Sequence, residues 1–326
     1  MPVWLQMIAA LSSALLSGIM GIALIPFLQK CRFCDPEPDS DAGQNQNADA
    51  VSGNRLKPTM CGILLMFGCT AGFVLSYTLY MQFMGADRTG TDFQTESHVL
   101  RMMLLHGILF GIIGWVSDYV RTVLRRPESS DTDLIVIFVA FFTSYSFLKF
   151  YPEEKILDFG FFQWEAGVLS VPVRAVLLTL FWYSVQKPEQ NVDGADITVS
   201  TVQLLFMTVL SIAGKQNLNA LYALTTAGAC LGCFYWNLYP AKCRLGQTGT
   251  YWLGITVPLI CLHYHRMDIF LLYLTAWLIN SLPLLFKKKT LLYQLREDGK
   301  SPVQRILILT AFALFCSVMS VMPEHT

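Results

Sequence analysis

About ten stretches of mainly apolar residues, each near the length of a membrane-crossing helix, recur along this chain of 326 residues. A helix needs roughly 20 apolar residues to cross the hydrocarbon core of a bilayer. The runs are continuous rather than alternating and are too long for the strands of a membrane barrel. The pattern predicts an all-α polytopic membrane protein with spans near 3–29, 59–84, 102–117, 132–150, 166–186, 198–214, 219–238, 251–265, 269–286 and 306–322.

Composition excludes a soluble protein of this length. Charged residues make up 14% of the chain and hydrophobic residues 54%, whereas roughly 25% of the residues of an average globular protein are charged. The 23 basic and 23 acidic residues cancel, so no overall field attracts nucleic acid. We therefore expect a membrane protein with no nucleic-acid partner.

The domain organisation follows from the spacing of the runs. No loop is long enough for a separate soluble domain, so residues 1–326 are interpreted as one integral membrane domain. Segment 1–29 lacks a basic start, and its apolar run is too long for a cleavable signal, so we interpret it as a retained anchor. Residues 36–54 are polar and poor in aromatics, which is typical of a flexible loop.

The distribution of positive charge predicts the orientation in the cell membrane. If both termini lie outside, 16 of the 23 Lys and Arg residues fall on the cytoplasmic side and seven on the other. This topology makes loop 36–54 cytoplasmic.

The nine cysteines do not form an obvious disulfide framework, because most lie inside apolar runs. We therefore expect five of these cysteines to be buried and to pack like small apolar residues. They are Cys69, Cys230, Cys233, Cys261 and Cys316. The pair Cys31-x-x-Cys34 has no second pair or nearby histidine, which favours free thiols over a metal or redox site.

Five polar patches interrupt the apolar pattern, and the predicted topology places all of them on the cytoplasmic side. They are residues 55–62, 114–121, 190–196, 237–250 and 293–299. An isolated carboxylate at a span end is often a solvated cap, and Asp-Gly is a common turn signal. Carboxylates at the edge of a membrane nevertheless favour a functional site.

The order and content of these patches resemble the phospho-N-acetylmuramoyl-pentapeptide transferase family, MraY, within the polyprenyl-phosphate sugar-1-phosphate transferases. The most specific pieces are Pro58-Thr59-Met60, Asp193-Gly194-Ala195-Asp196, and Asn237-x-Tyr-Pro-Ala leading into Gly246-x-Thr-Gly-Thr. Each is weak alone, but together they cover nearly the whole chain in family order. The resemblance implies an MraY-like fold with ten spans, both termini outside and an active site on cytoplasmic loops.

The resemblance also implies a reaction. Members of this family transfer a phospho-sugar from a UDP-sugar, UDP-MurNAc-pentapeptide, to undecaprenyl phosphate in peptidoglycan synthesis. Both reactants are anionic, so phosphoryl transfer needs a divalent cation, usually Mg²⁺, with hard oxygen ligands. The implied partners are a polyprenyl phosphate, a UDP-sugar and the membrane. A homodimer or a complex with another cell-wall synthesis protein is also compatible with the resemblance.

The chain departs from the family pattern at the positions that carry the chemistry. The family's Asp-Asp pair corresponds to Ser117-Asp118, and the Asp of its Gly-Asp-Thr-Gly-Ser motif corresponds to Gln247. Its three histidines correspond approximately to residues 292–294, ending at Gln294. At an effective dielectric constant of about 20, two unit charges 4 Å apart interact by about 4 kcal/mol. Two lost carboxylates would therefore make binding of Mg²⁺ through the usual ligands very weak.

The ligand-binding part of the pattern is better preserved. The resemblance assigns catalytic remnants to Asp118, Asp193 and Asp196, with Ser117, Gln247 and Gln294 at the degenerate positions. Asp118 and Asp193 are the candidate ligands if a metal binds at all. Substrate-binding roles are assigned to Lys57, Thr59, Arg121, Asn191, Asn237, Gly246, Thr248 and Gly249.

Three functions remain open at this stage. The first is a catalytically impaired homologue with no resident cofactor, which binds lipid carrier, nucleotide or a protein partner. The second is an active phospho-sugar transferase that uses Mg²⁺ in an altered metal site. The third is a transporter, which sparse intramembrane charges and the lack of an inverted repeat disfavour.

Overall fold

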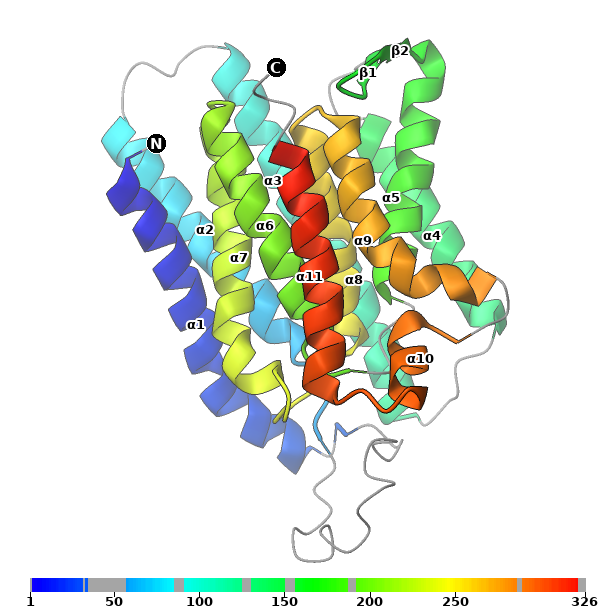
Figure 1. Cartoon of the computed structure of the whole chain (residues 1–326). Helices are drawn as coiled ribbons and strands as arrows, with labels where there is room; N and C mark the ends of the chain where they lie inside the picture. The colour runs from blue at the N-terminus through cyan, green and yellow to red at the C-terminus, as the bar shows by residue number, and fades with distance from the viewer. Residues whose placement is uncertain are drawn as a thin grey trace, which may run out of the picture.

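The structure is a computed structural model that describes residues 2–31, 33–34, 57–84, 91–124, 130–149, 156–186, 192–285 and 289–321. The described chain forms a bundle of long helices, as predicted (Figure 1). These helices are α1 (Val3–Lys30), α2 (Gly62–Met84), α3 (Thr91–Thr122), α4 (Ser130–Lys149), α5 (Ser170–Gln186), α6 (Ala195–Ala213), α7 (Asn217–Asn237), α8 (Gly246–His263), α9 (Met267–Leu285) and α11 (Pro302–Val321). Each predicted span overlaps one of them. The flexible loop expected at 36–54 lies outside the described residues.

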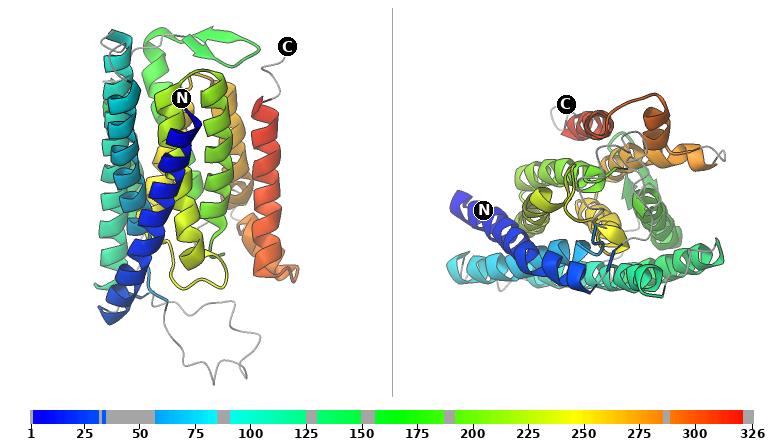
Figure 2. Two further views of the ribbon diagram at one scale, coloured as in Figure 1. Left: turned by 90° about the vertical axis from the view of Figure 1, so that its left-hand side faces the viewer. Right: turned by 90° about the horizontal axis from the view of Figure 1, so that it is seen from below.

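Eight of the described helices are long and apolar enough to cross a membrane. Helix α4 is outside this group, and it contributes a shorter apolar helix over Ile135–Lys149. Helix α8 also falls outside this group, and all of its residues are buried. Neighbouring helices surround it near the centre of the bundle (Figure 2). A helix screened from lipid can carry polar residues, which is why α8 begins five residues before the predicted span.

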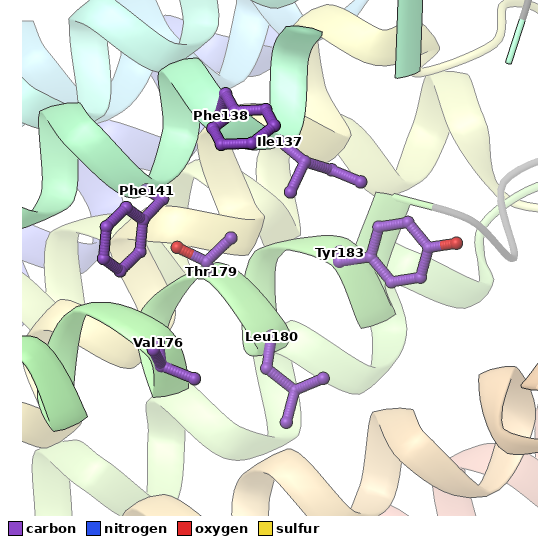
Figure 3. A pocket seen from close by; sticks show the side chains of 7 residues that line it. All are labelled: Ile137, Phe138, Phe141, Val176, Thr179, Leu180 and Tyr183. Atoms are coloured by element: carbon purple, nitrogen blue, oxygen red, sulfur yellow. The ribbon is translucent and has the colours of Figure 1, made fainter. Parts of the chain in front are cut away.

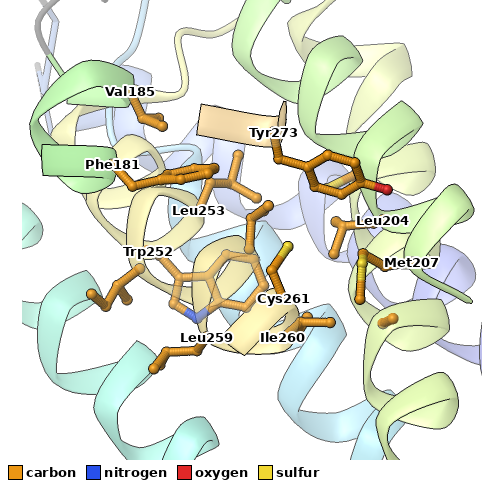
Figure 4. Packing of buried hydrophobic residues seen from close by; sticks show 14 of the residues in the cluster. Phe181, Val185, Leu204, Met207, Trp252, Leu253, Leu259, Ile260, Cys261 and Tyr273 are labelled. Carbon is orange, nitrogen blue, oxygen red and sulfur yellow. The ribbon is translucent and has the colours of Figure 1, made fainter. Parts of the chain in front are cut away.

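The core around α8 is built from large apolar side chains of several helices (Figure 4). Trp252 of α8 is fully buried, and the ring of Tyr251 packs edge-on against Trp182 of α5 at a centroid distance of 4.9 Å. The polar side chain of Gln203 lies in this core with hydrogen bonds to both its amide oxygen and its amide nitrogen. Gln203 accepts a hydrogen bond from Trp277 Nε1 (3.0 Å) and donates one to the carbonyl of Tyr273 (3.0 Å).

Small residues join α1 to α2 and α7. The Ser13 hydroxyl lies 2.6 Å from the carbonyl oxygen of Thr225 and 2.8 Å from that of Gly68. The Ser17 hydroxyl donates to the carbonyl of Ala229 (3.0 Å). Close backbone approach through small residues is typical of helix packing in membranes. It fixes α1 as part of the bundle.

Shorter elements lie outside the long helices. Strands β1 (Ile156–Asp158) and β2 (Gln163–Glu165) pair antiparallel with Leu157 opposite Trp164, and a 3₁₀ turn (Gly167–Leu169) precedes α5. The sequence does not indicate this hairpin, because three-residue strands are too short to show an alternating pattern. Helix α10 (Leu291–Glu297) contains part of the fifth polar patch.

The two ends of the bundle differ in content. The start of α1, the end of α11 and the β hairpin lie at one end, and the first residues of α2, α6 and α8 lie at the other (Figures 1 and 2). The described polar patches therefore gather at the end away from the termini, which agrees with the predicted topology. Which side of the membrane this end faces stays a prediction.

A groove lies between α4 and α5 (Figure 3). It has a volume of about 350 Å³ and an apolar lining. The lining residues are Ile137, Phe138, Phe141, Val176, Thr179, Leu180 and Tyr183. The groove lies along α4 and α5 and contains none of the predicted site residues.

The buried cysteines agree with the sequence interpretation. The five predicted packing cysteines are buried free thiols, and Cys31 and Cys34 are also free.

Candidate functional site

Asp118, near the end of α3, is hydrogen-bonded to the first residues of α8. Its Oδ1 accepts from the backbone N–H of Gln247 (3.0 Å), and its Oδ2 accepts from the backbone N–H (2.9 Å) and hydroxyl (2.7 Å) of Thr248. The side chain is fully buried. The first N–H groups of a helix lack partners within the helix and carry partial positive charge. Asp118 therefore acts as an N-terminal cap for α8, supplied by another helix.

Arg121 adds a positive charge to the same carboxylate. Its guanidinium lies 3.4 Å from Asp118 Oδ1, three residues along α3. Residues three apart share one face of a helix, so this pair follows directly from the spacing. The Asp118 carboxylate thus receives donors from both α3 and α8.

Glycines allow this close approach of α3 and α8. A side chain at Gly114 would collide with the carbonyl of Gln247. Gly246 has a φ of +71°, and a Cβ there would lie 2.5 Å from Asp118 Oδ2 and 2.7 Å from the hydroxyl of Thr59. Glycine is favoured at a positive φ because it has no Cβ. The Gly246-x-Thr-Gly pattern therefore has a direct structural role.

Asp193 lies between two cations that come from different loops. Its Oδ2 is 3.0 Å from Lys57 Nζ, and its Oδ1 is 3.7 Å from Arg244 Nε. The three side chains are 14%, 26% and 24% exposed, respectively. We call Lys57, Asp193 and Arg244 the ion-pair cluster. It joins the first, third and fourth polar patches, as their resemblance to a shared site implies.

The backbones of the first and fourth patches are paired as well. Arg244 N–H donates to the carbonyl of Pro58 (2.8 Å), Cys61 N–H to that of Arg244 (3.1 Å) and Gly62 N–H to that of Leu245 (2.9 Å). A disulfide between Cys61 and Cys243 crosses the same pairing. The ion-pair cluster therefore rests on two segments that are held together.

Thr59 and Asn237 occupy supporting positions. Thr59 is fully buried beside Gly246, and its N–H donates to the carbonyl of Phe33 (2.9 Å). The Asn237 amide donates to the carbonyl of Cys243 (3.0 Å) and is 3% exposed. The Asn237 side chain thus holds the loop that carries Arg244.

Asp196 differs from the other two carboxylates. It lies in the first turn of α6 and is half-buried. No hydrogen bond or ion pair joins its carboxylate to another residue within the described ranges. It is therefore the candidate carboxylate whose oxygens remain available to a ligand.

The remaining predicted residues are distributed unevenly. Gly249 is buried in the first turn of α8, packed against Gly62, and Ser117 is half-buried on α3. Gln294 lies on α10 and donates to the carbonyl of Lys289 (2.7 Å), and α10 contacts α9 and α11. The fifth patch thus shares the end of the bundle without a described contact to the ion-pair cluster. Asn191 lies outside the described residues.

Sequence reasoning missed Arg244 and the disulfide. Arg244 stood in the fourth patch, but no motif singled it out from its neighbours. Cys61 and Cys243 lie within polar patches. That location was the available signal, although a separation of 182 residues gives no indication of pairing.

The fold and the polar end together define a multi-pass membrane protein with acidic and basic loop residues clustered at one end of a helix bundle. Residues 100–265 match the family described as Glycosyl transferase family 4. The chain belongs to this family, and the resemblance found in the motifs is confirmed.

Known proteins similar to this chain carry the name Phospho-N-acetylmuramoyl-pentapeptide-transferase. The protein from Clostridium beijerinckii is 24% identical over 331 residues, covering 93% of this chain and 92% of its own. That from Heliobacterium modesticaldum is 25% identical over 255 residues, covering 75% and 70%. That from Carboxydothermus hydrogenoformans is 26% identical over 251 residues, covering 73% and 69%. The similarity is low in identity but extends over most of the chain.

Proposed function

We propose that this chain is a cell-wall glycolipid protein that binds a phosphate-bearing substrate of the family reaction and is impaired in the transfer step. The ligand class is a polyprenyl phosphate, such as undecaprenyl phosphate, or a UDP-sugar. The observation that carries the binding part is the ion-pair cluster. Lys57 and Arg244 reach one point from separate loops, and both are about a quarter exposed.

A phosphate group is a suitable partner for this pair of cations. Arginine and lysine bind phosphate oxygens through charge-assisted hydrogen bonds. An incoming phosphate would replace Asp193 between Lys57 and Arg244, leaving the carboxylate to solvent. The similar proteins named as phospho-N-acetylmuramoyl-pentapeptide-transferases support this ligand class.

The impaired transfer step is inferred from the oxygen ligands that remain. In this family Mg²⁺ would neutralise phosphate charge during transfer. Here both oxygens of Asp118 already accept hydrogen bonds from α8, and Asp193 is bound to two cations. Position 247 supplies a neutral amide. Because these carboxylate oxygens are already engaged, we infer that the positions of the usual ligands fit a Mg²⁺ ion poorly.

An active transferase remains the second candidate because of Asp196. Its carboxylate is half-buried, lies three residues after Asp193 and has no partner in the described part of the chain. Such a group could accept a proton or contribute one ligand to an altered metal site.

One assay separates the two candidates. Purified protein is incubated with UDP-MurNAc-pentapeptide, undecaprenyl phosphate and Mg²⁺, and release of UMP is measured beside saturable binding of each substrate. We expect binding without turnover. Binding should weaken in Lys57→Gln and Arg244→Gln but not in Lys300→Gln, an exposed lysine between α10 and α11. Turnover that disappears in Asp193→Asn or Asp196→Asn would establish the active transferase instead.

We also infer that both termini lie outside the cell and that the ion-pair cluster faces the cytoplasm. The distribution of Lys and Arg supports this orientation. Reporter fusions that require a cytoplasmic location should be inactive at Thr326 and active when inserted in loop 36–54. The opposite pattern would reverse the topology.

A further inference from the structure

The disulfide between Cys61 and Cys243 lies at the base of the ion-pair cluster. It links residues 182 positions apart in the sequence, with a Cα–Cα distance of 6.3 Å. Both residues are buried, with exposed fractions of 2% and 0%. The other seven cysteines are free thiols, so this pair is the one covalent cross-link among the cysteines.

Each half of the disulfide is adjacent to a ligand-binding segment. Cys61 precedes α2 and lies four residues after Lys57, and Cys243 directly precedes Arg244. The bond therefore fixes the distance between the two segments that present the cluster's cations.

We propose that the Cys61–Cys243 pair is a redox-responsive clamp that sets the affinity of the ion-pair cluster for its phosphate-bearing ligand. This inference rests on the proposed function. With the bond intact, Lys57 and Arg244 are held at one point, ready for an anion. With the bond reduced, the two segments separate more easily. Ligand binding must then order them again, and this cost in free energy lowers the affinity of the cluster for the ligand.

The chemistry is a thiol–disulfide exchange. A thiolate of a dithiol reductant attacks one sulfur, a mixed disulfide forms, and the second thiol of the reductant resolves it. Two electrons and two protons pass to Cys61 and Cys243, and the reductant becomes a disulfide. A small disulfide oxidant such as oxidised glutathione reverses the step. The cytosol maintains dithiol reductants that keep most protein thiols reduced, so on the predicted cytoplasmic side the bond would form under oxidising conditions.

Reduction should loosen the site without unfolding it. The backbone hydrogen bonds between Pro58, Cys61 and Gly62 on one segment and Arg244 and Leu245 on the other do not depend on the sulfur atoms. The carbonyl of Cys243 also keeps its bond from Asn237. Hydrogen bonds hold the segments in register, and the disulfide restricts their opening.

The nearby thiol of Cys34 does not compete with an external dithiol for reaction with the disulfide. Cys34 forms an isolated backbone bridge with Pro58, and burial raises the pKa of its thiol. A protonated thiol is a poor nucleophile. The redox state of the pair is therefore set by external dithiols that reach it when the segments open.

The test uses wild-type protein in lipid nanodiscs, treated with oxidised glutathione or dithiothreitol. Alkylation and peptide mass spectrometry report the state of Cys61 and Cys243. The probes are undecaprenyl phosphate and UDP-MurNAc-pentapeptide, and we expect at least about fivefold tighter binding of one probe in the oxidised state. Linkage requires the bound probe to make the disulfide harder to reduce by the same factor.

Two variants give the controls. The double variant Cys61→Ala, Cys243→Ala should bind like reduced wild type and ignore dithiothreitol. Cys316→Ala, which removes a buried thiol of α11, should keep the full redox response. Equal affinity in both redox states, or failure of oxidised glutathione to form the bond, overturns the clamp.

A separate measurement distinguishes failure of the clamp from failure of the proposed function. If neither probe binds in either redox state, the ligand assignment fails. Amide hydrogen exchange of residues 59–64 and 243–250 then still tests the clamp. Faster exchange after reduction supports it, and unchanged exchange overturns it.

Discussion

Replacing Asp118 should reduce stability rather than remove a metal ligand. Asp118→Ala would leave three donors from Gln247 and Thr248 without their acceptor, beside the charge of Arg121. An unsatisfied buried donor costs about 1–3 kcal/mol, and breaking a buried charged pair costs about 3–5 kcal/mol. Because Arg121 is 17% exposed and stays partly hydrated when its partner is lost, we expect a loss of about 3–5 kcal/mol. Asp118→Asn should cost about 2 kcal/mol, since the amide keeps one acceptor and turns a donor toward α8.

The measurement is reversible unfolding of purified protein in mixed detergent, followed by circular dichroism. Ser117→Ala is the matched control, because this half-buried neighbour on α3 makes no described polar contact, and it should change stability by less than about 0.5 kcal/mol. A double-mutant cycle with Thr248→Val should show that the two residues are coupled. Full stability in Asp118→Asn would refute the capping role.

Three further changes test the same end of the bundle. Gly246→Ala should lower stability by about 1–3 kcal/mol in the same unfolding assay, because of its positive φ and the short approach to Asp118. Asp196→Asn should leave stability within about 0.5 kcal/mol of wild type, since no described partner is lost, and a large loss would reveal a structural contact. Gln247→Asp should destabilise the protein in EDTA and be partly rescued by Mg²⁺, which unfolding curves with and without the ion would show.

Hydrophobic pattern was sufficient to locate the long helices, because lipid requires each span to satisfy its own backbone hydrogen bonds. It was less accurate for α8, whose polar start (Gly246–Thr250) falls outside an apolar run. Complete burial by other helices, which the chain order does not reveal, permits that polar start. The β hairpin was missed for a different reason, since three-residue strands leave no periodic signal.

Motif resemblance predicted that all five patches lie at the same end of the bundle. Among them, the first, third and fourth meet at Lys57, Asp193 and Arg244. The resemblance could not predict how each carboxylate is used. The pairing of Asp118 with α8 depends on contacts between residues about 130 positions apart. The same limit applies to the disulfide, because pairing over 182 residues depends on the folded backbone alone.

The charge arrangement around Asp118 also explains why a neutral residue at position 247 is compatible with a stable fold. The backbone nitrogen of Gln247 lies 3.0 Å from Asp118 Oδ1, so an acidic side chain there would bring a second negative charge near the first. At 4 Å and an effective dielectric constant of about 20, that repulsion is worth about 4 kcal/mol, which a bound dication would offset. With glutamine in place, Arg121 and the first turn of α8 are enough to balance the single carboxylate. Glutamine at position 247 and the capping of α8 by Asp118 are therefore compatible parts of one arrangement.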